Sequence, residues 1–101
     1  MIPLDDNELK GLIKAIGMKA YVEILFPALS RDKDISIMKL RQKYPEFNKY
    51  TPTAQNTRRS KAKKIFDNGW ELEALKNISL STRTDPFVRA KAKEFLLKYE
   101  K

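Results

Sequence analysis

Apolar residues recur with the spacing of an α-helix along almost the whole chain of 101 residues, and no stretch alternates as a β-strand does. Glycine and proline interrupt the pattern at positions such as Gly17, Pro45 and Gly69, where helices end. Hydrophobic residues make up 42% of the chain, enough for one modest core at this length. We therefore expect a single all-α domain over residues 1–101, a compact bundle of about five to six short helices.

The second predicted helix, from Met18 to about Leu29, is apolar on nearly every side and should be the central buried helix. Pro27 lacks an amide hydrogen and its ring crowds the preceding turn, so this helix should kink there or end near Phe26. Three other helices are expected to begin at capping residues: Asp5 or Asp6, Asp34 or Ser36, and Thr51. A loop at residues 45–50 precedes the helix that Thr51 caps. Further helices are expected at residues 70–78 and from residue 86 onward.

The fourth predicted helix carries the most basic stretch of the chain. Thr51 can cap it, Pro52 suits its first position, and the segment reads TPTAQNTRRSKAKKIFDN with five basic side chains and one acid. The net charge of +8 is uneven, with +3 over residues 30–52 and +4 over residues 53–68. Clustered lysine and arginine attract polyanions, so nucleic acid is the leading class of partner. The alternative interpretation is a basic surface that only water and salt contact.

Residues 18–70 resemble a helix-turn-helix DNA-binding domain. They read as an apolar helix, a polar bend, a short amphipathic helix, a turn, and a capped basic helix that ends in Ile65 and Phe66. The resemblance implies that the basic helix, residues 52–67, enters the major groove while the helix before it crosses the backbone. Residues 70–101 would then form a helical cap on this core.

A second, local likeness lies within the basic helix. Its segment from Gln55 to Lys64 reads QNTRRSKAKK and is similar to the homeodomain recognition helix, which reads QNRR followed by alternating lysines; Thr57 is an insertion relative to that pattern. This resemblance implies an adenine-reading role for Asn56.

The helical wheel assigns faces independently of either likeness. If Ala62 and Ile65 face the core, Asn56 and Arg59 lie among the outward residues and are the best candidates for reading bases. Hydroxyls and lysines on the same face suit phosphates. The predicted DNA-binding residues are Thr53, Asn56, Thr57, Arg59, Ser60, Lys63 and Lys64 on the helix and Lys49 before it.

Arg58 falls on the core side of the same wheel. An unpaired buried charge would cost several kcal/mol, so we expect Arg58 to be ion-paired, with Glu23 or Glu46 as candidates. Gln55 lies at the edge of the buried face, and the pattern leaves its role open.

The composition argues against catalysis and cofactors. The chain has no cysteine and no histidine, which removes disulfides, thiolate metal sites and the commonest general base at neutral pH. No glycine-rich phosphate loop, nucleophile motif or metal-ligand spacing occurs, and helix capping explains the paired carboxylates. We expect no catalytic, cofactor-binding or metal-binding residue, and no enzyme activity.

Three functions remain open. The first is sequence-specific binding of double-stranded DNA by a small transcriptional or mobile-element regulator. The second is an interaction module whose basic helix docks an acidic partner protein, and the third is an RNA or single-strand binder that stacks bases on Tyr44, Phe47 and Tyr50. Without a leader or an apolar run of about 20 residues, we expect an intracellular protein with no membrane partner, acting as a monomer or weak homodimer.

Overall fold

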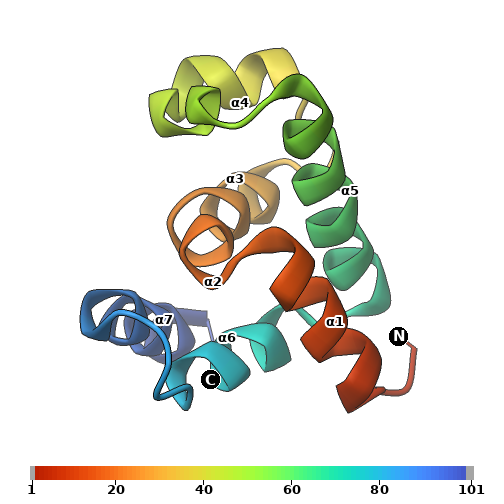
Figure 1. Cartoon of the computed structure of the whole chain (residues 1–101). Helices are drawn as coiled ribbons and strands as arrows, with labels where there is room; N and C mark the ends of the chain where they lie inside the picture. Colours follow the sequence, from red (N-terminus) through yellow and green to blue (C-terminus); the bar gives the residue numbers. More distant parts are fainter. Residues whose placement is uncertain (1, 100–101) are drawn as a thin grey trace.

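Six helices and no strand make up residues 2–99, the part of the chain that the computed structural model describes, and they confirm the predicted all-α bundle (Figure 1). The first helix is α1 (Asp6–Ile16). The second is continuous and consists of α2 (Met18–Ala20), the π-helical turn η1 (Tyr21–Leu25) and α3 (Phe26–Arg31). The elements that follow are α4 (Ile37–Lys43), the 3₁₀ turn η2 (Pro45–Lys49), α5 (Pro52–Asn68), α6 (Glu71–Ser79) and α7 (Pro86–Tyr99).

The central helix does not end near Phe26, which was one of the two outcomes that the sequence left open at Pro27. It continues past Pro27 to Arg31, because a wider turn precedes the proline. In that turn the amide of Phe26 donates to the carbonyl of Tyr21, five residues back. A π-helical turn of this kind shifts the carbonyls that the proline ring would otherwise crowd.

The core forms around this central helix, whose aromatic side chains contact both α5 and α7. Phe26 is 1% exposed and its ring lies 5.8 Å from that of Phe66 on α5 and 5.1 Å from that of Phe95 on α7, centre to centre. Tyr21 is fully buried and donates its hydroxyl hydrogen to the Glu71 carbonyl at 3.1 Å. Burial, with a contribution from the Glu71 carboxylate, raises the pKa of Tyr21 well above its usual value, so the hydroxyl stays protonated.

Arg58 does not pair with Glu23 or Glu46, contrary to the sequence prediction. Its Nη1 donates instead to the carbonyl of Ile16, at the C-terminal end of α1, and its guanidinium lies 4.0 Å from the centre of the Tyr50 ring. A helix C-terminus presents free carbonyls and the negative end of the helix dipole, so it can hold a cation without a carboxylate. Gly17 adjoins this contact at φ 90°, and a Cβ there would lie 3.0 Å from Nη1.

The connection between α4 and α5 is also more ordered than the predicted loop 45–50. Pro45 starts the short 3₁₀ turn η2, and Phe47 within this turn is fully buried. The turn brings the chain from the end of α4 directly to the Thr51 cap of α5.

The predicted cap of α5 is confirmed, and its contribution to stability can be measured. The Thr51 hydroxyl oxygen accepts a hydrogen bond from the Ala54 amide at 3.2 Å. Thr51→Ala is expected to lower the free energy of unfolding by about 1 kcal/mol, because this amide loses its acceptor. Urea unfolding measures the change, and Thr53→Ala, two residues later on the exposed side of the same helix, is the matched control. Equal losses in the two variants would contradict a capping role.

Candidate functional site

One buried side chain holds α4, η2 and α5 together. Gln55, on the first half of α5, is only 3% exposed, and its amide nitrogen donates to the carbonyls of Phe47 at 3.1 Å and Tyr50 at 2.9 Å. Its amide oxygen accepts from Nε of Arg41 on α4 at 2.7 Å. This resolves the role that the sequence left open: Gln55 is a structural residue, and its side chain is not available to read a base.

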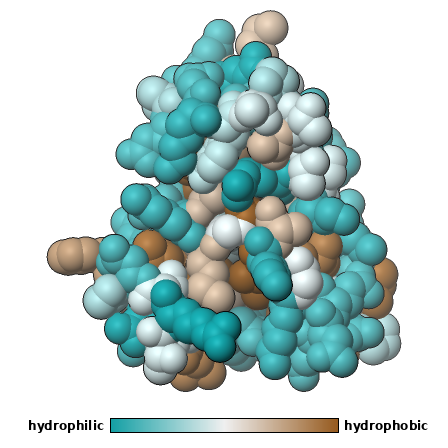
Figure 2. Space-filling model, in the orientation of Figure 1, coloured by the Kyte–Doolittle hydropathy of each residue, from teal (hydrophilic) through white to brown (hydrophobic). Residues whose placement is uncertain are grey.

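The segment of α4, η2 and α5 that Gln55 holds together contains the net positive charge of the protein. We call residues 35–66 the basic lobe; it includes α4, η2 and most of α5, at the top and right of Figure 1. It has nine basic side chains and one acid, a net +8 that equals the net charge of the whole chain, because the remaining residues have twelve of each sign. The upper part of the molecule, over α4 and the start of α5, is mainly hydrophilic in Figure 2. The basic residues of the lobe are Lys39, Arg41, Lys43, Lys49, Arg58, Arg59, Lys61, Lys63 and Lys64.

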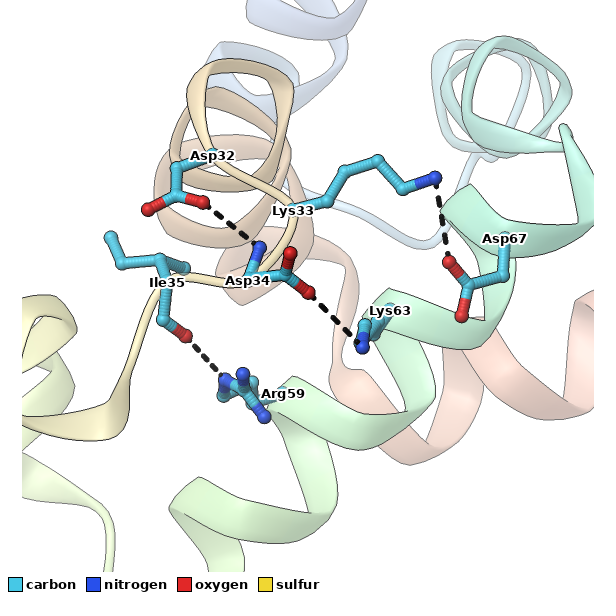
Figure 3. A network of polar contacts seen from close by, with 7 residues as sticks. All are labelled: Asp32, Lys33, Asp34, Ile35, Arg59, Lys63 and Asp67. Atoms are coloured by element: carbon cyan, nitrogen blue, oxygen red, sulfur yellow. Dashed lines mark hydrogen bonds and ion pairs between the residues drawn. The ribbon is translucent and has the colours of Figure 1, made fainter.

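A row of three contacts ties one stripe of α5 to the connection between α3 and α4 (Figure 3). Nε of Arg59 donates to the Ile35 carbonyl at 2.6 Å, and Nζ of Lys63 lies 3.4 Å from the Asp34 carboxylate. One turn further along α5, the Asp67 carboxylate lies 3.5 Å from Nζ of Lys33. Positions 59, 63 and 67 are four residues apart and therefore share one side of the helix. We call these three contacts the loop clamp.

The predicted DNA-binding residues divide into two groups. Arg59 and Lys63 belong to the loop clamp, and Lys64 pairs with Glu8 of α1 at 3.1 Å, so these three contact their own chain. The others are exposed and lie together at the N-terminal half of α5 and just before it: Lys49, Thr53, Asn56, Thr57 and Ser60.

The ion pair between Lys63 and Asp34 is weak enough for Lys63 to leave Asp34 and pair with another anion. The side chain of Lys63 is 37% exposed and that of Asp34 is 86% exposed, so water and salt screen the pair. Arg59 differs, because its Nε bond is short while its two Nη groups have no partner among residues 2–99. The clamp thus positions Arg59 and leaves its terminal donors free for another acceptor.

The sequence prediction omitted three exposed lysines of the basic lobe. Lys61 lies on α5, and Lys39 and Lys43 lie on α4. None of the three pairs with an acid among the described residues. The signal for the α4 pair was in the sequence, since neither lysine belongs to the apolar face that contains Ile37, Leu40 and Tyr44.

The likeness to a homeodomain recognition helix does not extend to how the side chains are used. Gln55 and Arg58 of the QNTRR string make contacts inside the domain, and the Nε of Arg59 holds the loop clamp. Asn56 is the exposed member of this string that offers both an amide donor and a carbonyl acceptor.

No protein family, curated protein or solved structure matches this chain in sequence or fold comparisons. Between residues 2 and 99, no helix combines the length and apolar character that crossing a membrane requires. The same described part holds no group of three or more acidic side chains placed to bind a metal ion.

Proposed function

We propose that the protein binds double-stranded DNA sequence-specifically, as a small transcriptional or mobile-element regulator, with the N-terminal half of α5 in the major groove. The observation that carries this proposal is the location of the charge. The entire net +8 resides in the basic lobe, and four of its exposed lysines have no acidic partner among residues 2–99. Such a surface attracts the phosphate backbone and orients the protein on it.

The outward face of α5 supplies the contacts in this arrangement. Asn56 can make two hydrogen bonds to an adenine, because its amide oxygen accepts and its amide nitrogen donates, while the hydroxyls of Thr53, Thr57 and Ser60 suit phosphates or base edges. Lys49 and Lys61 flank this face, one before the helix and one in its third turn, and neutralise phosphates.

The internal contacts keep this face fixed. Gln55 holds η2, and with it Lys49, against α5, and the loop clamp holds the adjoining stripe of the helix against the connection between α3 and α4. A surface arranged before binding loses less conformational entropy when it docks. Helix α4, with Lys39 and Lys43 exposed, would then cross the phosphate backbone as the helix-turn-helix resemblance implies.

Duplex DNA has more support here than a single strand. Phe47 is fully buried, and the Tyr50 ring is engaged by Phe47 at 5.7 Å and by the Arg58 guanidinium at 4.0 Å. Of the three aromatic side chains considered for base stacking, these two are committed to the domain. An acidic partner protein remains the second candidate, because lysines of α5 already pair with carboxylates in this structure.

Fluorescence anisotropy with labelled duplex DNA, single-stranded DNA and structured RNA at several salt concentrations tests the proposal. We expect duplex preference and a slope of log affinity against log salt of about −3 to −4, because four exposed lysines would each displace one counterion. Absence of binding to all three at moderate salt would contradict the proposal and direct attention to an acidic protein.

Base reading and phosphate binding have separable effects. Once a preferred site is selected, Asn56→Ala is expected to reduce discrimination between that site and an adenine-substituted site by about 1–3 kcal/mol, because it removes a bidentate contact. Lys49→Ala should weaken both sites by the same factor and make the salt slope shallower by about 0.9. Competition titrations measure both quantities. If the two variants behave alike, Asn56 does not read a base.

A further inference from the structure

A second basic site lies outside the basic lobe, in a cavity of about 480 Å³ between α1, the start of α2, and the segment that follows α6. Three cationic side chains line it: Lys10 and Lys14 of α1, and Arg83 of the connection between α6 and α7. No carboxylate lines this cavity among the residues that the structure describes. Figure 2 shows apolar surface at the centre of the lower half of the molecule, bordered by hydrophilic side chains.

The tertiary fold assembles these three charges from distant parts of the sequence. Lys10 and Lys14 are one helical turn apart, a spacing at which like charges repel. Arg83 adds a third positive charge from more than sixty residues away. None of the three pairs with an acid in residues 2–99, so an anion in the cavity would relieve this repulsion.

The remaining lining adds one hydrogen-bond donor and an apolar side. The Ser81 oxygen accepts from the Arg83 amide at 3.3 Å, which leaves the hydroxyl hydrogen to donate elsewhere. Ile13 is 3% exposed and Met18 is half-buried, and both border the cavity. Asn77 also borders it, with its amide nitrogen donating to the Glu73 carbonyl at 3.1 Å.

We propose that this cavity binds a small phosphorylated molecule, with the phosphate held by Lys10, Lys14, Arg83 and the Ser81 hydroxyl and the organic part against Ile13 and Met18. The guanidinium of Arg83 suits a phosphate because it can donate two parallel hydrogen bonds, and the lysines add point charges. A cavity of this size is in the range of small-ligand sites. The site is separate from the α5 surface and does not depend on DNA binding.

Titration of the isotopically labelled protein, followed by amide chemical shifts, tests this site. Adenosine monophosphate is the probe, adenosine is the match without phosphate, and inorganic phosphate represents the head group alone. We expect saturable shifts at Asn77, Ser81 and Arg83 with adenosine monophosphate, weaker ones with phosphate, and none with adenosine. Lys14→Gln and Arg83→Gln should each weaken binding roughly tenfold, through loss of a charge-assisted hydrogen bond.

Lys93→Gln, which removes an exposed lysine of α7, is the control and should bind as the unchanged protein does. Equal binding of adenosine would overturn recognition of the phosphate. Equal weakening by Lys93→Gln, or shifts confined to the α5 surface, would overturn the cavity as the site. Absence of saturable shifts with both phosphate and adenosine monophosphate would overturn the proposal altogether. Circular dichroism of each variant separates loss of binding from loss of folding.

Discussion

Replacing Lys49 and Lys61 together with glutamine is expected to weaken duplex DNA binding on the order of 25-fold at physiological salt, because two released counterions contribute roughly fivefold each. Both side chains are exposed, and neither pairs with an acid among the described residues, so their loss should leave the fold intact. The slope of log affinity against log salt should become shallower by about 1.8. Anisotropy titrations of the double variant measure both changes.

The matched control removes the same charge elsewhere. Lys19→Gln with Lys93→Gln also replaces two exposed lysines, but these lie outside the basic lobe. We expect the control to lose less than threefold in affinity and to keep the salt slope, since only the long-range field changes. If both double variants weaken binding equally, net charge rather than the lobe attracts DNA, and the proposed site is wrong.

Gln55→Leu is expected to lower the free energy of unfolding by about 3 kcal/mol, because Gln55 is buried and hydrogen-bonded to three residues of the lobe. Leucine is of similar size, but it leaves Nε of Arg41 and the Tyr50 carbonyl without the partner they have now. Each such group costs about 1–3 kcal/mol when it is removed from water without a hydrogen bond. Urea unfolding measures the loss, and DNA affinity should fall as well, because η2 and Lys49 are no longer held against α5.

Asn56→Leu is the neighbouring control. It makes a comparable polar-to-apolar change on the exposed side of the same helix, where we expect a change within about 0.5 kcal/mol. A Gln55→Leu loss of less than 1 kcal/mol, or equal losses in the two variants, would show that the buried amide does not hold the lobe together.

The helices themselves were predictable because local signals define them. Thr51 and Pro52 begin α5, and Gly69 ends it in a left-handed conformation at φ 80°, as capping chemistry requires. The buried positions Ala62 and Ile65 follow from the same periodicity. The sequence left two outcomes open at Pro27, because a wider turn can absorb a proline and nothing in the local sequence distinguishes that turn from a helix end.

The use of polar side chains within the site was less predictable. A helical wheel gives the direction of Arg58, Arg59 and Lys63, but it does not say which backbone lies alongside. Arg58 contacts a carbonyl 42 positions away and Arg59 a carbonyl 24 positions away. Carbonyl acceptors belong to every residue, so the residue types that the sequence displays do not indicate them.

The most direct test of the proposed function maps where duplex DNA touches the protein, by amide chemical shifts of the labelled protein during titration at moderate salt. The proposal predicts that the largest shifts fall between Lys49 and Lys61, with smaller ones near Lys39 and Lys43 on α4. Largest shifts on α7 or around the cavity between α1 and α6, or no shift at saturating DNA, would contradict binding by the exposed face of α5.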